Sequence, residues 1–437
     1  MKTNEVIEGQ NFHLIKNVKA EKKFHIPESC NAEEAIKYIK SQFKKLNSSQ
    51  MNLGSYSTTI MEEDISKLIP YFEKYNLVNQ NEYPVFKDII QYSTMIFSEL
   101  FNAPKPENVY GTSTVGSSEA ILLSILNMKF VWKRKGGTGA PNIVIGNNTH
   151  SIWKQFATFL DIEPRFLECD EKSYTVIPHK LRALLDENTI GVCATLGNTF
   201  TGLYDDVESI NFELQKFEEM ASIFIPLHVD AASGGFVAPF ITKNIIWDFR
   251  LEHVVSINVS SHKFGFVYPS LGWILWKDKS ILSDQMKMSV DYLTGQFYNV
   301  SVNFSRSAGN LIAQYYNFLT LGFEGYKAKI KKCYELANYL RDSINQIPNI
   351  EVLKIEEELG LPVVILSSAS NLLNIRQVVL ELERKGWKIP CYALGNKNQR
   401  WVCRIVVRGE MTKNVIARFI HDFKSIIILK DRRLICA

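Results

Sequence analysis

The feature of this sequence that most limits its fold is an alternation of short apolar runs with amphipathic segments between about residues 56 and 325. The apolar runs are 142–145, 191–195, 223–229, 254–259 and 272–276. Segments with helical periodicity accompany them at 88–100, 118–133 and 150–160. Short apolar strands separated by helices predict a mostly parallel sheet covered by helices on both faces. Ligands of such sheets bind where the strands reach their carboxyl ends.

The chain is long enough for more than one domain, and we expect three parts. The first is an N-terminal arm, 1–55, which is polar and predicts one helix, 32–45, started by Asn31. The second is the large domain, 56–325. A long helical stretch, with an expected break near 322–325, leads into a small C-terminal domain, 326–437. Its predicted strands and helices are, in order, 351–355, 362–366, 375–385 (helix), 387–392, 401–407 and 413–428 (helix).

Composition excludes several classes of function. The 437 residues carry 50 basic and 46 acidic side chains, a net charge of +4, which favours neither nucleic acid nor a membrane surface as a partner. No apolar run approaches the roughly 18 residues that a membrane-spanning helix needs. The seven cysteines include no C-x-x-C pair, so neither a disulfide framework nor a metal site is expected. With a polar N-terminus and no apolar segment behind it, the sequence predicts a cytoplasmic protein.

Two clusters of small and polar residues follow predicted strands. The first, 228–236, sets Asp230 before two alanines, and the second, 256–265, contains Ser260, His262 and Lys263. A lysine buried beside another potential cation stays neutral and nucleophilic, and such an amine can hold an aldehyde cofactor as an imine. A carboxylate at a neighbouring strand end can pair with the nitrogen of a cofactor ring. The plainer alternatives are a surface lysine at a strand end and an aspartate that caps a turn.

Three further groups could complete a cofactor site. Ser117 and Ser118, within the run 111–120, begin a predicted helix, where hydroxyls and backbone N–H groups bind phosphate, although a simple serine cap has the same pattern. His150 could stack on a cofactor ring and supply a proton, or it could be an ordinary cap or core residue. Thr195 and Thr199 follow another strand and could flank the cofactor, or they could belong to an ordinary β-turn.

Together these clusters resemble the PLP-dependent group II amino-acid decarboxylases, and among them the bacterial glutamate decarboxylases. The matching runs are 111–120, 190–204, 228–240, 247–251, 262–266, 303–306 and 313–316, and their order and spacing are specific. The resemblance implies PLP fold type I (aspartate aminotransferase-like). That fold is an α/β large domain with a mixed, mostly parallel seven-stranded sheet, plus a small C-terminal α+β domain. It also implies pyridoxal 5'-phosphate as the cofactor.

The resemblance also implies individual roles. Lys263 looks like the lysine that binds the cofactor's aldehyde, and Asp230 like the partner of its ring nitrogen. Ser117 and Ser118 match the phosphate-binding pair. The other implied cofactor contacts are His150, which stacks on the ring, Thr195, Thr199 and Ala232, with Ser260 and His262 at the phosphate. Phe304 and Ser305 match residues lent by the neighbouring subunit, so the resemblance implies a homodimer or a higher oligomer with shared active sites.

The substrate pocket departs from the family pattern. Arg404 matches the arginine that holds the substrate α-carboxylate. The glutamate enzymes line the distal-carboxylate pocket with a Thr-Phe pair and an Asp, and this chain has Ser55-Tyr56 and Asn79 there. An amide can donate to a carboxylate without an added proton, so glutamate fits, and so does a different side chain. The C-terminal residues lack the His-Thr of the acid-resistance enzymes, so no pH-gated lock of that type is expected.

The sequence therefore predicts an α-decarboxylase of an L-amino acid, glutamate or a related acidic amino acid before others. Arg404 would help to turn the bond between Cα and the carboxylate perpendicular to the cofactor ring. His150, Lys263 and Tyr298 are the candidates for the acid that returns a proton to Cα. The alternatives are a decarboxylase for another amino acid, an aldehyde-forming decarboxylase, a carbon–carbon lyase and a non-catalytic paralogue.

Overall fold

The computed structural model describes residues 31–43, 49–78, 81–171, 173–242, 244–290, 297–353, 355–369, 373–395 and 400–435. The chain forms two compact units, 1–49 and 50–437. In the first unit, helix α1 (Ala32–Phe43) lies where the sequence predicts it, and the side chain of Asn31 accepts a hydrogen bond from the backbone of Glu34 at 2.9 Å. Everything below concerns the second unit. The division of the chain at residues 55 and 325 remains a prediction.

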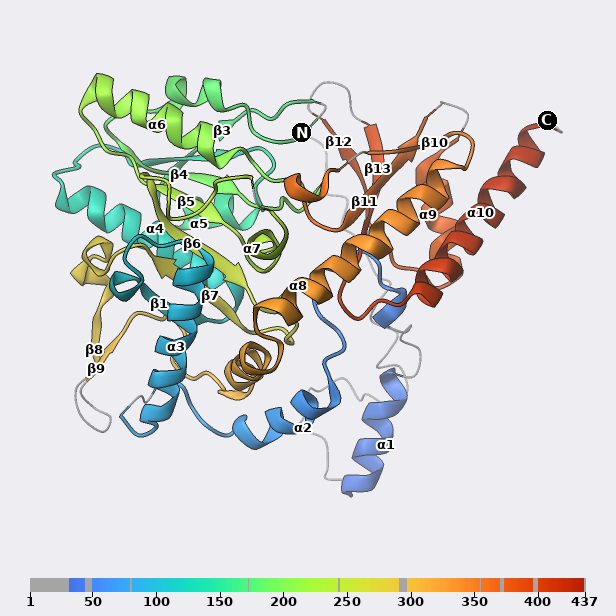
Figure 1. Cartoon of the computed structure of the whole chain (residues 1–437), viewed down its shortest axis with the longest axis horizontal. Helices are drawn as coiled ribbons and strands as arrows, with labels where there is room; N and C mark the ends of the chain where they lie inside the picture. The colour runs from blue at the N-terminus through green and yellow to red at the C-terminus, as the bar shows by residue number, and fades with distance from the viewer. Residues whose placement is uncertain are drawn as a thin grey trace, which may run out of the picture. The chain divides into compact units, whose positions relative to one another are not determined.

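A seven-stranded sheet forms the centre of the second unit (Figure 1). Its strands are β1 (Tyr110–Thr114), β2 (Asn142–Gly146), β3 (Glu163–Leu167), β4 (Thr189–Thr195), β5 (Leu227–Asp230), β6 (Val254–Ser260) and β7 (Gly272–Trp276). Their spatial order is β1-β7-β6-β5-β4-β2-β3. In this sheet β7 pairs antiparallel with β1 and β6, and the other pairs are parallel. The predicted mixed, mostly parallel seven-stranded sheet is therefore confirmed.

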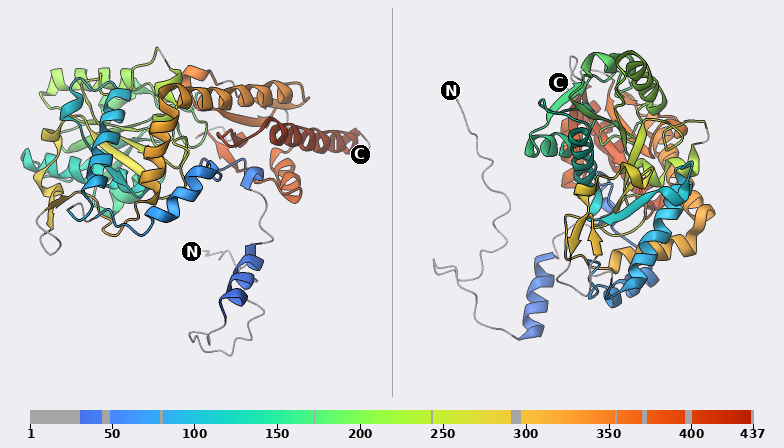
Figure 2. Two further views of the ribbon diagram at one scale, coloured as in Figure 1. Left: turned by 60° about the horizontal axis from the view of Figure 1, so that its bottom comes forward. Right: turned by 90° about the vertical axis from the view of Figure 1, so that its left-hand side faces the viewer.

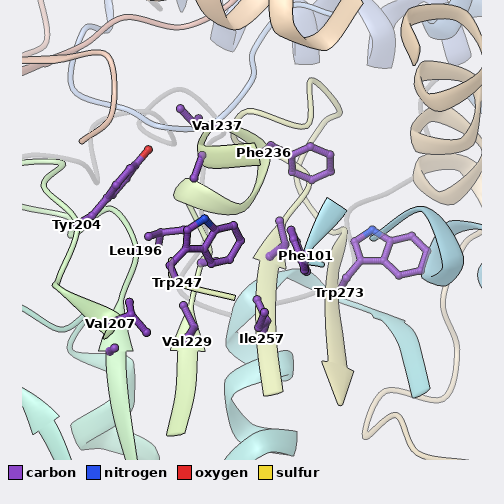
Figure 3. Packing of buried hydrophobic residues seen from close by; sticks show 14 of the residues in the cluster. Phe101, Leu196, Tyr204, Val207, Val229, Phe236, Val237, Trp247, Ile257 and Trp273 are labelled. Atoms are coloured by element: carbon purple, nitrogen blue, oxygen red, sulfur yellow. The ribbon is translucent and has the colours of Figure 1, made fainter. Parts of the chain in front are cut away.

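Helices cover both faces of this sheet (Figures 1 and 2). They are α2 (Glu63–Phe72), α3 (Pro84–Leu100), α4 (Gly116–Arg134), α5 (Ile152–Phe159), α6 (Val207–Ala221), α7 (Ala238–Ile241) and α8 (Gly309–Asn345). The largest apolar cluster packs α3, α6 and α8 against one face, and Figure 3 shows Trp247, Phe101 and Phe236 within it. On the other face, α4 and α5 pack through Ile121 and Trp153 against β2 and β4. Strands β8 (Met288–Val290) and β9 (Phe297–Asn299) pair antiparallel in a separate two-stranded sheet.

The C-terminal part is a four-stranded antiparallel sheet with its own apolar core. Its strands are β10 (Ile350–Val352), β11 (Val363–Ser368), β12 (Cys391–Leu394) and β13 (Arg400–Val406), in the order β10-β11-β13-β12. Helices α9 (Ile375–Arg384) and α10 (Lys413–Ile435) and the second half of α8 pack on this sheet. The predicted small α+β fold is confirmed. The expected break in α8 occurs at Gly322, which has φ +54°.

Two predicted strands begin later than expected, and proline explains both. The structure begins β5 at residue 227 instead of 223 and β12 at residue 391 instead of 387. Pro226 and Pro390 directly precede these strands and have no N–H to donate to a neighbouring strand.

In the part of the chain that the structure describes, no helix is both long enough and apolar enough to span a bilayer.

Candidate active site

The carboxyl ends of the central strands meet at one cavity. Strands β4, β5 and β6 end at Thr195, Asp230 and Ser260, and α4 begins two residues after β1. The cavity measures about 300 Å³. Its walls include Gly116, Ser117, Ser118, His150, Thr195, Thr199, Asp230, Ala232, Ser233, Ser260, His262 and Lys263. Residues far apart in the sequence thus meet where an open α/β sheet binds ligands.

The amine of Lys263 lies inside this cavity. It donates a hydrogen bond to the hydroxyl of Ser233 at 3.0 Å and lies 5.5 Å from the centre of the Tyr56 ring. Burial lowers the pKa of Lys263 to about 8; Asp230 acts in the opposite direction and Arg404 lowers it further. A sizeable fraction of the amine is therefore neutral near physiological pH, and the neutral amine is the form that attacks an aldehyde.

Asp230 accepts hydrogen bonds from three neutral donors. The indole N–H of Trp153 reaches one carboxylate oxygen at 2.8 Å. The side-chain amide of Asn258 and the backbone N–H of Ala232 reach the other oxygen at 3.0 and 3.1 Å. An ionised carboxylate has about four acceptor positions, so one is left for a donor in the cavity. The arrangement suits a protonated ring nitrogen.

An anion site lies at the start of α4. Ser117 is buried, and its hydroxyl accepts a hydrogen bond from that of Ser260 at 2.7 Å. Gly116 has φ +72°, a backbone conformation that favours glycine, and it turns the chain into the helix. The backbone N–H groups of the first turn and the helix dipole favour a bound anion there. The sequence predicts a phosphate pocket at this position, and the geometry suits one.

Two histidines line the cavity in neutral form. Burial, followed by the nearby charge of Lys263, lowers the pKa of His262 to about 4, and the same two causes lower the pKa of His150. Helix α5 begins at Ile152, two residues later than predicted, because His150 occupies the preceding turn. Its Nδ1 accepts a hydrogen bond from the backbone of Ile152 at 3.2 Å. His150 therefore makes a local hydrogen bond at the helix start and also lines the cavity, and its stacking on a cofactor ring stays a prediction.

These residues fit PLP. The cavity supplies an amine, a carboxylate with a free acceptor position, and hydroxyl and backbone donors at a helix start. Thr195 adds a sign that a polar group belongs there: its Oγ1 is buried and has no hydrogen-bond partner among the described residues. A buried hydroxyl without a partner is costly, so a ligand that pairs with it is expected.

Arg404, on β13 of the C-terminal sheet, is not among the residues that line the cavity, and neither are Ser55 and Tyr56, but its charge acts on the Lys263 amine. Its guanidinium lies 4.7 Å from the centre of the Tyr56 ring and donates hydrogen bonds to the backbone carbonyls of Thr199 and Gly54. Its Nε is buried without a partner in the described chain. The neighbouring Ser55 accepts a hydrogen bond from the backbone of Ser57 at 3.0 Å through its hydroxyl.

The structure does not bring every predicted residue to the cavity. Asn79 lies outside the described residues. Phe304 is half-buried, Ser305 is exposed, and neither lines this protomer's cavity. Sequence reasoning also missed three residues that contact the site, namely Ser233, Trp153 and Asn258. Ser233 and Asn258 lie within the two polar clusters, 228–236 and 256–265, whereas Trp153 is recognised only once the packing of α5 against the sheet is known.

The fold and the cavity define a class, the PLP-dependent enzymes of fold type I. Comparison with known proteins narrows it. Residues 42–367 match the pyridoxal-dependent decarboxylase conserved domain, so the chain belongs to the pyridoxal-dependent decarboxylase family. The chain is 35% identical over 400 residues to glutamate decarboxylase beta of Listeria monocytogenes, covering 90% of this chain and 86% of that protein. It is 36% identical over 415 residues to the glutamate decarboxylase of Petunia hybrida, covering 93% and 83%.

A solved structure agrees with this placement. Glutamate decarboxylase of Lactobacillus brevis superposes with a TM-score of 0.88 at 32% identity, over 94% of this chain and 96% of that one. The protein is therefore a PLP-dependent amino-acid decarboxylase. The expected cofactor and the carboxy-lyase activity are confirmed at this level.

Proposed function

We propose that this enzyme removes the α-carboxylate of L-glutamate and releases 4-aminobutyrate and CO₂. The observation that carries the proposal is the meeting of the Lys263 amine, the Asp230 carboxylate and the Ser117–Ser260 hydroxyls at one cavity. The glutamate decarboxylases among its relatives support the choice of substrate.

In this proposal each cavity residue has a chemical task. Lys263 holds the cofactor's aldehyde and Asp230 pairs with the ring nitrogen. Ser117, Ser118, Ser260 and His262 bind the phosphate, and His150, Thr195, Thr199 and Ala232 contact the ring and its substituents. When bound, PLP supplies an electron-accepting ring conjugated to the substrate's α-carbon. His150 and Lys263 are the described groups that could return a proton to Cα after CO₂ leaves, because both line the cavity.

Arg404 would bind the substrate α-carboxylate. A guanidinium whose Nε is buried without a partner is ready for an anion, and a pair of charged hydrogen bonds to a carboxylate is strong. The Tyr56 ring fixes the plane of this guanidinium from one side. Ser55, Tyr56 and Asn79 would line the pocket for the distal carboxylate.

We further propose a homodimer, or a higher oligomer, in which Phe304 and Ser305 complete the neighbour's cavity. The exposure of Ser305, the partial exposure of Phe304 and the absence of both from the lining of this protomer's own cavity support this role. We also propose a cytoplasmic location, which the free thiols of the five described cysteines support because disulfides form in oxidising compartments.

The test is a product analysis of the PLP-loaded protein. It is incubated with glutamate, aspartate and a panel of other amino acids, and the products are identified by mass spectrometry. Formation of 4-aminobutyrate and CO₂ from glutamate is expected. Consumption of another amino acid with glutamate untouched would overturn the choice of substrate. Aldehyde and ammonia as products would indicate the oxidative alternative, and no turnover of any amino acid would indicate a non-catalytic paralogue.

A further inference from the structure

Four polar side chains lie side by side within the central sheet. They are His228 and Asp230 of β5 and Ser256 and Asn258 of β6, all fully or almost fully buried. Parallel pairing sets His228 beside Ser256 and Asp230 beside Asn258. Because side chains alternate along a strand, all four point to the face that α4 and α5 cover. The intervening residues, such as Val229 and Ile257, point into the apolar cluster on the other face (Figure 3).

These four side chains form a single chain of hydrogen bonds that ends at Asp230. The amide nitrogen of Asn258 donates to the carboxylate at 3.0 Å, so the amide oxygen is left to accept. Nε2 of His228 lies 2.7 Å from that oxygen and must carry the proton. Nδ1 then accepts from the hydroxyl of Ser256, also at 2.7 Å. Every bond therefore points its hydrogen toward the carboxylate, and bonds aligned in this way polarise one another.

His228 contributes no positive charge to this chain. Burial lowers its pKa to about 4, although the hydrogen bond with Asn258 and the charge of Asp230 act in the opposite direction. The ring is therefore neutral at physiological pH and acts as a dipole. We call the hydrogen-bonded series Ser256–His228–Asn258 the relay. Because it is neutral, it can orient the Asp230 carboxylate, whereas a second cation would compete with the cofactor's ring nitrogen for that carboxylate.

The position of the relay argues for function as well as for packing. Strands covered on both faces usually bury apolar side chains, and a polar side chain there is costly unless it is fully paired. Here the polar residues continue from strand to strand until they reach the one cavity-lining member, Asp230. Asn258, Trp153 and Ala232 each donate a hydrogen bond to a fixed position on the Asp230 carboxylate. The carboxylate therefore keeps a single orientation toward the cavity.

We propose that Asn258, supported by His228, is a positioning residue that aims the Asp230 carboxylate at the protonated ring nitrogen of the cofactor. This inference rests on the proposed role of Asp230. Asn258 and His228 do not line the cavity, so the effect of substituting them must be measured as a change in the contact that Asp230 makes with the ring nitrogen.

The test compares two ligands on the full-length apoprotein. One is PLP and the other is the analogue in which carbon replaces the ring nitrogen, and each dissociation constant is taken from the quenching of tryptophan fluorescence. The ratio of the two constants measures the contact with the ring nitrogen, and it cancels any general loss of affinity that a variant causes. A charge-assisted hydrogen bond predicts that wild type prefers PLP by about tenfold to a hundredfold.

Four variants separate the outcomes. Asp230→Ala removes the carboxylate, Asn258→Leu removes the relay at nearly constant volume, and Asn258→Ala repeats this without added bulk. Asn211→Leu is the matched control, because Asn211 is also buried and accepts a hydrogen bond from the backbone of a buried histidine, His253, away from the cavity. Thermal unfolding of each apoprotein reports the structural cost of each substitution.

The expected result is that Asp230→Ala abolishes the preference, both Asn258 variants lower it about fivefold or more, and Asn211→Leu leaves it within about twofold of wild type. If Asp230→Ala abolishes the preference and the Asn258 variants keep it, the relay is wrong and the proposed site stands. If Asp230→Ala itself keeps the preference, the proposed role of Asp230 is wrong and the relay falls with it. If Asn211→Leu lowered the preference for PLP as much as the Asn258 variants do, the effect would come from general packing of the sheet. That result would overturn the proposal.

Discussion

Replacing Lys263 with methionine should stabilise the apoprotein in a pH-dependent way. The folded environment lowers the pKa of Lys263 from 10.5 to about 8, so the charged amine is destabilising in the folded state. The lowered pKa means that the unfolded chain holds this proton more tightly, and the free energy of unfolding therefore rises with pH between the two pKa values. The free-energy cost of burying the charged Lys263 amine is complete below pH 8 and vanishes above pH 10.5. Methionine has no proton to lose and never incurs it.

The size of the effect follows from the shift. A difference of about 2.5 pKa units corresponds to about 3.4 kcal/mol at 1.36 kcal/mol per unit. The side chain of Lys263 retains partial solvent exposure at the cavity, so screening reduces this value, and we expect about 2 kcal/mol at pH 7. About half of this gain should disappear by pH 9.5, because by then most of the folded-state amine of wild type is neutral.

The measurement is urea unfolding of wild-type and Lys263→Met apoprotein at several pH values between 7 and 9.5. The difference between the two free energies of unfolding cancels the titration of all lysines that both proteins share. Lys331→Met, on the exposed surface of α8, is the control and should show no comparable pH dependence. A stabilisation by Lys263→Met that stays constant over this pH range would refute the reasoning, because it would come from apolar burial alone.

Three further substitutions test separate parts of the site. Trp153→Phe removes the indole donor to Asp230 and should weaken PLP binding about tenfold in a fluorescence or absorbance titration, while unchanged affinity would contradict the orientation argument. Arg404→Met should raise KM for the amino-acid substrate about a hundredfold with little change in PLP affinity, and an equal loss of both would assign Arg404 to the cofactor. Tyr56→Phe removes a 3.3 Å hydrogen bond to the carbonyl of Thr199 but keeps the ring, so denaturant unfolding should show a loss below about 1 kcal/mol. A larger loss would mean that the hydroxyl is more important than its geometry implies.

The sequence predicts the central strands of the sheet better than its edges. Strands β4 to β7 are buried along their whole length, and the apolar runs of β4 and β7 follow the pattern that burial on both faces produces, although β5 and β6 carry polar side chains on one face. The edge strands β1 and β3 were not predicted. Strand β1 is Tyr-Gly-Thr-Ser-Thr, and β3 is Glu-Pro-Arg-Phe-Leu with only its last residue buried, so neither has an apolar run. These two strands form because they pair with β7 and β2, and the amino-acid pattern of a single segment does not predict its pairing partner.

The same limit applies to the site. Lys263, Asp230 and Ser117 stand in local clusters whose chemistry is legible along the sequence, and the structure brings all three to one cavity. Asn258 stands in the same cluster, five residues before Lys263, but within strand β6, where nothing along the sequence shows what its side chain contacts. Its contact with Asp230 depends on the register between β5 and β6, which a single sequence does not contain. Sequence motifs therefore located groups that line the cavity, whereas the contacts between Asp230 and Asn258 required the fold.

The two sides of the cavity are built in different ways, and this bears on how substrate choice can change within the family. The cofactor side consists of strand ends of one rigid sheet, tied together by buried hydrogen bonds such as those around Asp230. The proposed substrate side is assembled from separate segments, because the contacts of Arg404 are the carbonyls of Gly54 and Thr199. A second arginine, Arg408, holds the same N-terminal segment through the carbonyl of Ser55. A substitution in the segment 52–59 can therefore reshape the proposed substrate pocket, and at Thr58, which donates hydrogen bonds to the carbonyls of His262 and Lys263, it also reaches the cofactor residues. Ser55 and Tyr56, where this chain departs from the glutamate pattern, lie in that segment.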